Sequence, residues 1–249
     1  MIERGSVSPA SAAAAHRRWW DEKARIYLSE HGQALAGSLQ WGPEGVTEAD
    51  LRLMGEVAGR SILEVGSGAG QCSQWLHSQG AHCISSDLSL EMLKAGDSAL
   101  IRVQADGYRL PFADRSFDIT FSSYGALPFL PDAPAVLREW ARVTRDLVIF
   151  SVTHPIRWAM RDDPADLTIS RSYFDRSTYI ERDDQNQVTY TEHHRTIGDW
   201  VGAIVAAGMS VAEIVEPEWP AWNGETWGAW SPDRGKLLPG TAIFVAKVQ

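Results

Sequence analysis

A glycine-rich segment between an apolar run and a helix-forming run constrains the fold of this 249-residue chain more than any other feature. Residues 61–65 (SILEV) resemble a buried strand, residues 66–70 (GSGAG) form a turn, and residues 71–79 favour a helix that Gly80 ends. Glycines let the backbone approach a ligand closely, and the helix that follows presents free N–H groups. The segment therefore predicts a nucleotide-binding turn.

Strands and helices alternate beyond this turn, which indicates an α/β fold with a mostly parallel sheet. We expect further strands at residues 81–86, 101–105, 117–122, 147–152, 211–215 and 241–248. We expect helices near residue 89, over 132–145 with Asp132 as N-cap, and from Thr196, which begins a capping box. The strand predicted at 147–152 (LVIFSV) is almost continuously apolar, as in a sheet covered on both faces.

The remaining segments are interpreted as parts of one domain, residues 1–249, around a core at 60–152. Residues 10–58 hold a predicted helix at 16–31 and a second helix from Thr47, in a capping box, to Ala58. Residues 153–195 are largely polar and lack periodicity, so we interpret them as an insertion. Residues 196–249 contain a long structured loop, 217–240, which holds four of the 11 tryptophans.

Charge and composition exclude several classes of protein. With 32 acidic and 23 basic residues, the net charge is −9, which argues against nucleic acid as a partner. No apolar run approaches the roughly 20 residues of a membrane helix, and residues 1–15 lack a secretory hydrophobic core. Two cysteines, Cys72 and Cys83, cannot form a disulfide scaffold, so free thiols and a cytoplasmic location are expected. No metal-type spacing of His and Cys occurs, and we predict no metal.

The residues around the turn discriminate between nucleotide-binding classes. Asp87 closes the next predicted strand 21 residues after Gly66, where a carboxylate can accept both ribose hydroxyls. A dinucleotide-binding G-x-G-x-x-G turn needs glycine at position 71, where this chain has Gln71. No Lys-Ser or Lys-Thr follows, which excludes a phosphate-binding P-loop. A nicotinamide-dependent oxidoreductase is therefore disfavoured.

Three segments resemble the class I S-adenosylmethionine-dependent methyltransferases. Residues 62–76 (ILEVGSGAGQCSQWL) resemble their motif I, and the resemblance continues through residues 87–93 (DLSLEML). Residues 110–118 (LPFADRSFD) are typical of the branch that contains quinone-biosynthesis and related small-molecule methyltransferases. The motifs cover about residues 60–152. The resemblance implies a three-layer Rossmann-like sheet of seven strands, mostly parallel with the last strand antiparallel, and an N-terminal helical lid.

The resemblance also implies roles for particular residues toward S-adenosylmethionine. Glu64 would interact with the cofactor's ammonium group, directly or through water. Asp87 would bind the ribose diol, with Leu88 against the adenine. The other implied contacts are to the amino-acid portion, by Gly66, Gly68, Gly70, Ser122 and Ser123, and to the adenine, by Asp106 with Gly107 beside it.

Catalytic candidates are weaker, because methyl transfer is an in-line displacement that needs a base only when the acceptor loses a proton. His154 follows the fifth predicted strand and is either a general base or a loop histidine bonded to backbone. Tyr124 either orients the acceptor or packs on the cofactor. Some branches of the family carry a His pair after the fourth strand, where residues 124–129 read YGALPF, which leaves the acceptor open.

Aromatic residues outside the shared motifs have several interpretations. Trp20 and Tyr27 either close over the cofactor or acceptor, or simply pack their helix on the sheet edge. The loop at 217–240 is an aromatic wall for the acceptor, an interface in a homodimer, or a structural flap. We expect an enzyme that methylates a small molecule, with oxygen slightly favoured and S-adenosylhomocysteine as product. The alternative is a non-catalytic protein that binds the cofactor.

Overall fold

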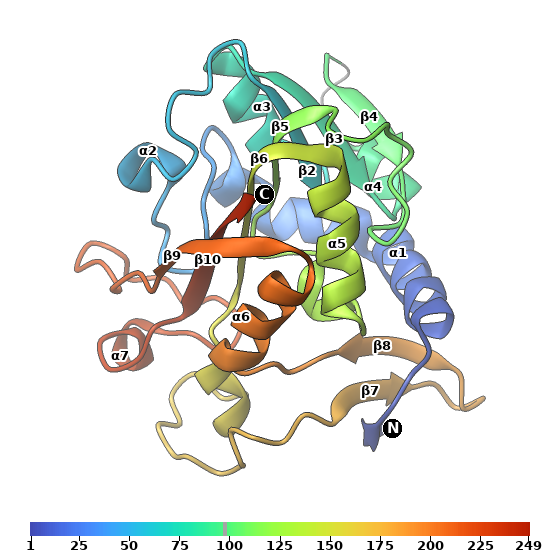
Figure 1. Cartoon of the computed structure of the whole chain (residues 1–249). Helices are drawn as coiled ribbons and strands as arrows, with labels where there is room; N and C mark the ends of the chain where they lie inside the picture. Colours follow the sequence, from blue (N-terminus) through green and yellow to red (C-terminus); the bar gives the residue numbers. More distant parts are fainter. Residues whose placement is uncertain (97–98) are drawn as a thin grey trace.

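The central element of the fold is a sheet of seven strands (Figure 1). The computed structural model describes residues 1–96 and 99–249. From one edge to the other, the strands are β4 (Ile101–Gln104), β3 (His82–Asp87), β2 (Ser61–Val65), β5 (Phe117–Ser122), β6 (Thr144–Thr153), β10 (Thr241–Val248) and β9 (Met209–Val215). The first five strands in this order, β4, β3, β2, β5 and β6, pair in parallel. Strand β10 is antiparallel to both of its neighbours. The predicted sheet is confirmed, and β2 and β5 have the predicted bounds.

Helices lie on both faces of this sheet and at its ligand-binding edge. They are α1 (Pro9–Leu35), α2 (Glu48–Leu51), α3 (Gln71–Ser78), α4 (Leu90–Lys94), α5 (Ala133–Val143), α6 (Ile197–Ala206) and α7 (Pro232–Gly235), with 3-10 turns η1 (Leu127–Phe129) and η2 (Pro155–Ala159). The predicted N-caps hold: Asp132 accepts from Ala135 N, and Thr196 forms a capping box with Asp199.

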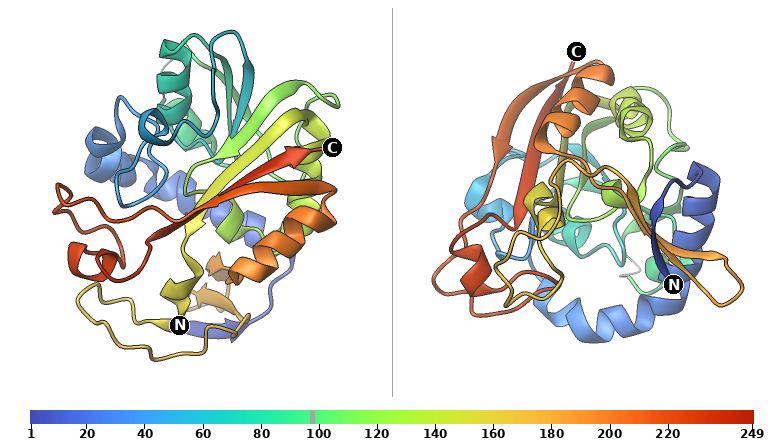
Figure 2. Two further views of the ribbon diagram at one scale, coloured as in Figure 1. Left: turned by 60° about the vertical axis from the view of Figure 1, so that its left-hand side comes forward. Right: turned by 90° about the horizontal axis from the view of Figure 1, so that it is seen from below.

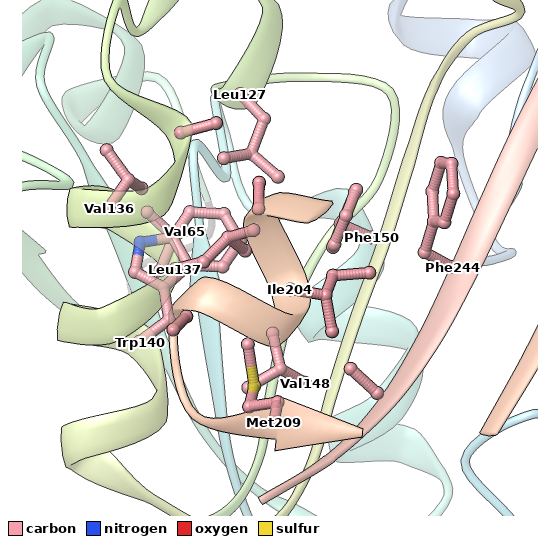
Figure 3. Packing of buried hydrophobic residues seen from close by; sticks show 14 of the residues in the cluster. Val65, Leu127, Val136, Leu137, Trp140, Val148, Phe150, Ile204, Met209 and Phe244 are labelled. Carbon is pink, nitrogen blue, oxygen red and sulfur yellow. The ribbon is translucent and has the colours of Figure 1, made fainter. Parts of the chain in front are cut away.

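Two apolar clusters make the sheet the middle of three layers. Successive strand residues point to opposite faces, so Leu63 packs in one cluster and Ile62 in the other. The first cluster includes Trp140 from α5 and Ile204 from α6, both fully buried, and Figure 3 shows them between these helices and the strands. The second includes Leu76 from α3. Both faces are covered, as the apolar strand at 147–152 predicted.

The helix predicted from Thr47 to Ala58 is wrong in length, because α2 ends after one turn. The capping box of Thr47 is present, but Arg52 adopts a left-handed φ of 53°. The buried carboxylate of Glu48 accepts hydrogen bonds from Met54 N at 2.7 Å and from the indole of Trp41 at 3.1 Å. These bonds draw the following chain back across the end of α2, which outweighs its local helix propensity.

A second, three-stranded sheet was not predicted. It joins β1 (Ile2–Gly5) to the hairpin of β7 (Thr178–Arg182) and β8 (Val188–Glu192), in the order β1-β7-β8. Part of the interpreted insertion is thus a hairpin that pairs antiparallel with the N-terminal residues. The two strands of the hairpin alternate in side-chain direction, and the turn between them places Asn186 at a φ of 61°.

Helix α1 is longer than the predicted 16–31 and lies beside the hairpin. It packs along β8 and against α4, and Figure 2 shows it in blue next to β7 and β8. At α4, the Asp21 carboxylate accepts from Ser89 Oγ at 2.6 Å. Among the described residues, no helix has the length and apolar character needed to cross a membrane. The cytoplasmic location stays a prediction.

Candidate functional site

The turn between β2 and α3 brings backbone to the wall of a cavity. Gly66 and Gly68 have φ angles of +72° and +56°, which side chains rarely adopt, and both line the cavity. A Cβ on Gly66 would lie 2.8 Å from the Cβ of Ala126, so the turn and the chain after β5 meet closely. Gly70, with φ +81°, is the N-cap of α3 and lies outside the lining. Its role is therefore to let the helix start against β3.

The cavity encloses about 350 Å³ at the carboxyl ends of β2, β3 and β5. This is the edge at which open α/β sheets bind ligands. It brings together most of the residues predicted to hold a cofactor. Those that line it are Glu64, Gly66, Gly68, Asp87, Leu88, Asp106, Gly107, Ser123, Trp20 and Tyr27, together with Tyr124. Ser122 is buried behind this lining, at the end of β5.

Glu64 supplies a buried carboxylate at the start of the turn. Only 3% of its surface is exposed, and its Oε2 accepts from Ser73 N at 3.0 Å and Ser73 Oγ at 2.6 Å. Burial raises the pKa of this carboxyl to about 7, against the lowering effect of Ser73. A bound cation would favour the ionised form, so the site is suited to an ammonium group.

Asp87 occupies the end of β3 and fixes the turn from the other side. Its Oδ2 accepts from Gly68 N and its Oδ1 from Ser89 N, each at 2.8 Å. Burial raises the pKa of this carboxyl to about 6. Each carboxylate oxygen can accept two hydrogen bonds, so capacity remains for the hydroxyls of a ligand.

Another part of the lining comes from the segments that follow β3 and β4. Leu88 and Met92 follow β3, and the turn after β4 contributes Asp106 and Gly107. The Asp106 carboxylate accepts from Tyr108 N at 3.0 Å, and the indole of Trp140 donates to Gly107 O at 3.2 Å. These bonds hold the turn in place at the cavity wall.

Two polar groups of the lining that the sequence did not single out lack a partner. Ser67 Oγ and His16 Nδ1 are buried and make no hydrogen bond with the described residues. Desolvation lowers the pKa of His16 to about 4, so the ring is neutral near pH 7. A buried polar group without a partner is costly, which indicates that a ligand supplies bonds here.

Tyr124 lies two residues after the end of β5 and is part of the cavity lining. Its φ of 53° is unusual for an aromatic residue, and such strain is concentrated at functional sites. Its N–H donates to Ser151 Oγ at 2.8 Å, and its hydroxyl lies 2.7 Å from Thr153 Oγ1. Ser123 Oγ donates to Gln40 O, which joins this segment to the chain after α1.

The structure places His154 outside both cavities described here. Its Nδ1 accepts from Ile156 N at 3.1 Å, and its Nε2 lies 2.7 Å from Glu216 Oε1, so both ring nitrogens are engaged. This geometry makes it the N-cap of η2 and gives no support to the predicted role as general base. His193 and His194 are buried, at 8% and 3% exposure, and neither lines a cavity.

A second cavity of about 540 Å³ adjoins the first. Its walls come from α1, from the segments after β5 and β6, from β8 and from the loop at 217–240. Aromatic side chains dominate its lining: Trp19, Trp20, Tyr27, Tyr124, Phe129, Trp158, Tyr190, Trp227 and Trp230. Five of these, Trp20, Tyr27, Tyr124, Phe129 and Trp227, also line the first cavity. The two cavities therefore share an aromatic wall.

Helix α1 and the loop at 217–240 meet over this shared wall. The ring of Trp227 lies 4.4 Å from that of His31, which lies 4.8 Å from Tyr27, and Tyr27 lies 5.4 Å from Trp20. Asn223 ties the loop down by donating to the carbonyls of Pro43 and Glu44. Both segments contribute residues to the lining of the two cavities, and their roles as lid and aromatic wall stay predictions.

The family profile described as "Methyltransferase domain" matches residues 63–152. Residues 63–152 of the chain therefore match a methyltransferase domain. Solved methyltransferases share the fold across nearly the whole chain. An S-adenosylmethionine-dependent methyltransferase from Mesorhizobium loti is 22% identical, with a TM-score of 0.59, over 83% of this chain and all of that one. The 1,6-didemethyltoxoflavin-N1-methyltransferase of Burkholderia thailandensis is 15% identical, with a TM-score of 0.60, over 99% and 93%.

Curated relatives match the methyltransferase domain more closely in sequence. A demethylmenaquinone methyltransferase of Corynebacterium urealyticum is 44% identical over 88 residues, which are 35% of this chain and 38% of that protein. One of Mycolicibacterium paratuberculosis is 40% identical over 99 residues, 39% of this chain and 43% of that protein. The chain thus spans less than half the length of these relatives. The family match at residues 63–152 includes most of the first cavity's lining and few residues of the second cavity's lining.

Proposed function

We propose that this chain transfers a methyl group from S-adenosylmethionine to an oxygen atom of a small, flat acceptor. The observation that carries the proposal is the shared aromatic wall between the two cavities. One cavity has carboxylates and a glycine turn suited to a nucleoside with an amino-acid tail. The other has a mainly aromatic lining suited to a flat acceptor.

The residues of the first cavity fit the cofactor. The Glu64 carboxylate would hold the ammonium group, Asp87 would accept from the ribose hydroxyls, and Leu88 with Asp106 would flank and bond the adenine. Ser67 Oγ, buried without a partner, would bond to the ligand's tail. The cofactor supplies an electrophilic methyl group on a positively charged sulfur.

The chain's own contribution is alignment and exclusion of water. A displacement at carbon needs the nucleophile held in line and close, which bound geometry can accelerate strongly. Trp20, Tyr124 and Trp227 enclose the junction of the two cavities. They would hold the flat face of an acceptor against the junction while Tyr124 Oη, fixed by Thr153, bonds to a polar edge.

The test is a methyl-transfer screen with isotopically labelled S-adenosylmethionine and a small-molecule extract, followed by mass spectrometry of the labelled product. We expect label on oxygen of a flat acceptor. Label on nitrogen or carbon contradicts the choice of atom. Tight calorimetric binding of S-adenosylhomocysteine without any labelled product would instead support a non-catalytic binding protein, and absence of cofactor binding would overturn the proposal.

A further inference from the structure

We propose that Glu192 binds the hydroxyl of the acceptor and takes its proton, and that the acceptor is therefore a phenol or enol with a flat body. This inference rests on the proposed function, since it concerns the second cavity as the acceptor site. The residue lies at the end of β8, in the hairpin that no sequence motif indicated.

The hairpin holds Glu192 rigidly at the cavity wall. Tyr190, two residues earlier on the same face of the strand, donates its hydroxyl to Glu192 Oε1 at 3.0 Å. The ring of Tyr190 packs 5.3 Å from that of His16 and 5.8 Å from that of Phe129. Both neighbours line the first cavity, so the pair of Tyr190 and Glu192 packs against residues of that lining.

Glu192 is less exposed than the charged groups that α1 contributes to the cavity. Lys23 and Glu30 are exposed, whereas Glu192 is half-buried, and burial raises the pKa of its carboxyl. Arg157 lies near enough to oppose that rise, but its guanidinium is paired with Asp162 at 2.9 Å. Among the described residues, Tyr190 is the one hydrogen-bond donor to Glu192, so lone pairs remain for a ligand.

The charge of Glu192 also reaches Tyr124 at the junction of the cavities. It contributes to the raised pKa of the Tyr124 phenol, which keeps that hydroxyl protonated. The charged and titratable groups that act on Glu192 itself are Tyr190 on its own strand, Glu181 on β7, and Arg157 with Asp162 after β6. An acceptor hydroxyl between Tyr124 and Glu192 would thus face one hydrogen-bond donor and one proton acceptor.

The proposed step balances without a further reactant. The acceptor oxygen forms its bond to the methyl carbon, the bond from that carbon to sulfur breaks with its electron pair passing to sulfur, and the hydroxyl proton passes to a Glu192 oxygen. A carboxylate whose pKa is moved toward neutrality is suited to this transfer. The product, a methyl ether, has no proton to offer Glu192 and would bind less tightly.

The neighbouring strand offers a matched control. Tyr179 on β7 donates its hydroxyl to Glu181 at 2.7 Å, which repeats the pair formed by Tyr190 and Glu192. Directly opposed residues pair Tyr179 with Glu192 and Glu181 with Tyr190, but neither Tyr179 nor Glu181 lines the cavity. A change at Glu181 thus tests the hairpin without removing a residue that lines the acceptor site, although it also removes one of the charges that raise the pKa of Glu192.

The experiment is calorimetry of 1-naphthol and 1-methoxynaphthalene with protein saturated with S-adenosylhomocysteine. We expect the wild type to prefer 1-naphthol by about tenfold, as for one hydrogen bond to a charged group. Glu192→Gln should lose that preference, Tyr190→Phe should reduce it, and Glu181→Gln should keep it. Between about pH 8 and pH 5, 1-naphthol affinity should fall in the wild type and stay level in Glu192→Gln.

Equal binding of both probes to the wild type, or an unchanged preference in Glu192→Gln, would overturn the inference. An equal fall with pH in Glu192→Gln would exclude proton acceptance by this residue. S-adenosylhomocysteine affinity, measured first on every variant, reports whether the fold is intact. If the cofactor product binds while neither naphthalene does, the inference fails and the proposed function stands. If the cofactor product does not bind the wild type, the proposed function fails.

Discussion

The two cavities share a wall but are built in opposite ways. The cofactor cavity takes most of its lining from residues 64–130, a continuous part of the chain in which each strand ends at the site. The acceptor cavity gathers α1, β8, the segments after β5 and β6, and the loop at 217–240. Its lining residues span from Trp19 to Trp230. The first cavity is set by local turns, and the second by packing between distant segments.

The two linings also differ in their chemical groups. The first cavity, proposed to hold the cofactor, is lined by a glycine turn and by three carboxylates, those of Glu64, Asp87 and Asp106. The acceptor cavity relies on rings that hold one another, such as Trp19 and Trp20, whose centroids lie 4.6 Å apart. Changes in the first cavity should therefore affect cofactor affinity, and changes in the second should leave it intact.

The largest expected effect is that of Asp87→Ala. The carboxylate holds the turn through Gly68 and Ser89 and would accept both ribose hydroxyls. Loss of about 3 kcal/mol, or roughly 100-fold in the affinity for S-adenosylhomocysteine, follows from two hydrogen bonds to a charged group. Calorimetry measures it, and Asp114→Ala, which breaks the ion pair to Arg142 away from the site, is the control. Retained affinity in Asp87→Ala would contradict the assignment of the ribose.

Gly66→Ala should destabilise the fold by about 2 kcal/mol or more, because left-handed backbone and a close contact act together. The new Cβ would lie 2.8 Å from Ala126 Cβ and 3.1 Å from Ala126 N. Gly68→Ala is the matched control, since its Cβ would meet only the flexible end of Met92 at 3.0 Å. Thermal unfolding should rank Gly66→Ala as the less stable variant, and equal stability would show that the turn has more room than its geometry indicates.

Trp19→Ala should weaken ligand binding in the acceptor cavity and leave ligand binding in the cofactor cavity intact. Trp19 lines the acceptor cavity only and packs 5.5 Å from Tyr190. Removal of the ring should lower 1-naphthol affinity by about tenfold through lost apolar contact. S-adenosylhomocysteine affinity should change less than about twofold. Calorimetry measures both affinities. A comparable loss of affinity for both ligands would show that Trp19 supports both cavities.

His154→Ala should have the smallest effect, a loss of about 1 kcal/mol of stability, typical of a lost N-cap. Burial lowers the pKa of His154 in the folded state, so its neutral form contributes stability that is complete above the unfolded pKa of about 6.5. That contribution is lost as the pH falls below this value. Urea unfolding across this pH range should therefore show a smaller difference between variant and wild type in acid. A large loss of cofactor affinity in His154→Ala would contradict this account and indicate that His154 belongs to the site.

Much of the first cavity's lining could be predicted from the sequence, because the signals that indicate it are local. A glycine turn with φ angles near +70°, a carboxylate at the end of β3 and N-caps at Asp132 and Thr196 all follow from neighbouring residues. The short α2 could not be predicted, since its end depends on hydrogen bonds from Trp41 and Met54 to Glu48. His154 was singled out by its position after a strand, but its partner Glu216 is 62 residues away.

The acceptor cavity illustrates the same limit more fully. Tyr190 and Glu192 lie in a short, polar strand, and β8 is held at the site by pairing with β7 and by packing along α1. The tryptophan content did indicate large aromatic surfaces near the cover of the site. It did not indicate which rings meet, because ring contacts such as Trp227 on His31 join residues nearly 200 positions apart.

The most direct test of the account is a crystal structure of the complex with S-adenosylhomocysteine. The account predicts the amino group beside Glu64, the ribose hydroxyls at Asp87, and the sulfur facing the shared wall at Tyr124, with the aromatic cavity open beyond it. A ligand bound in the aromatic cavity, or a sulfur that faces away from Tyr124, would contradict the assignment of one cavity to the cofactor and the other to the acceptor.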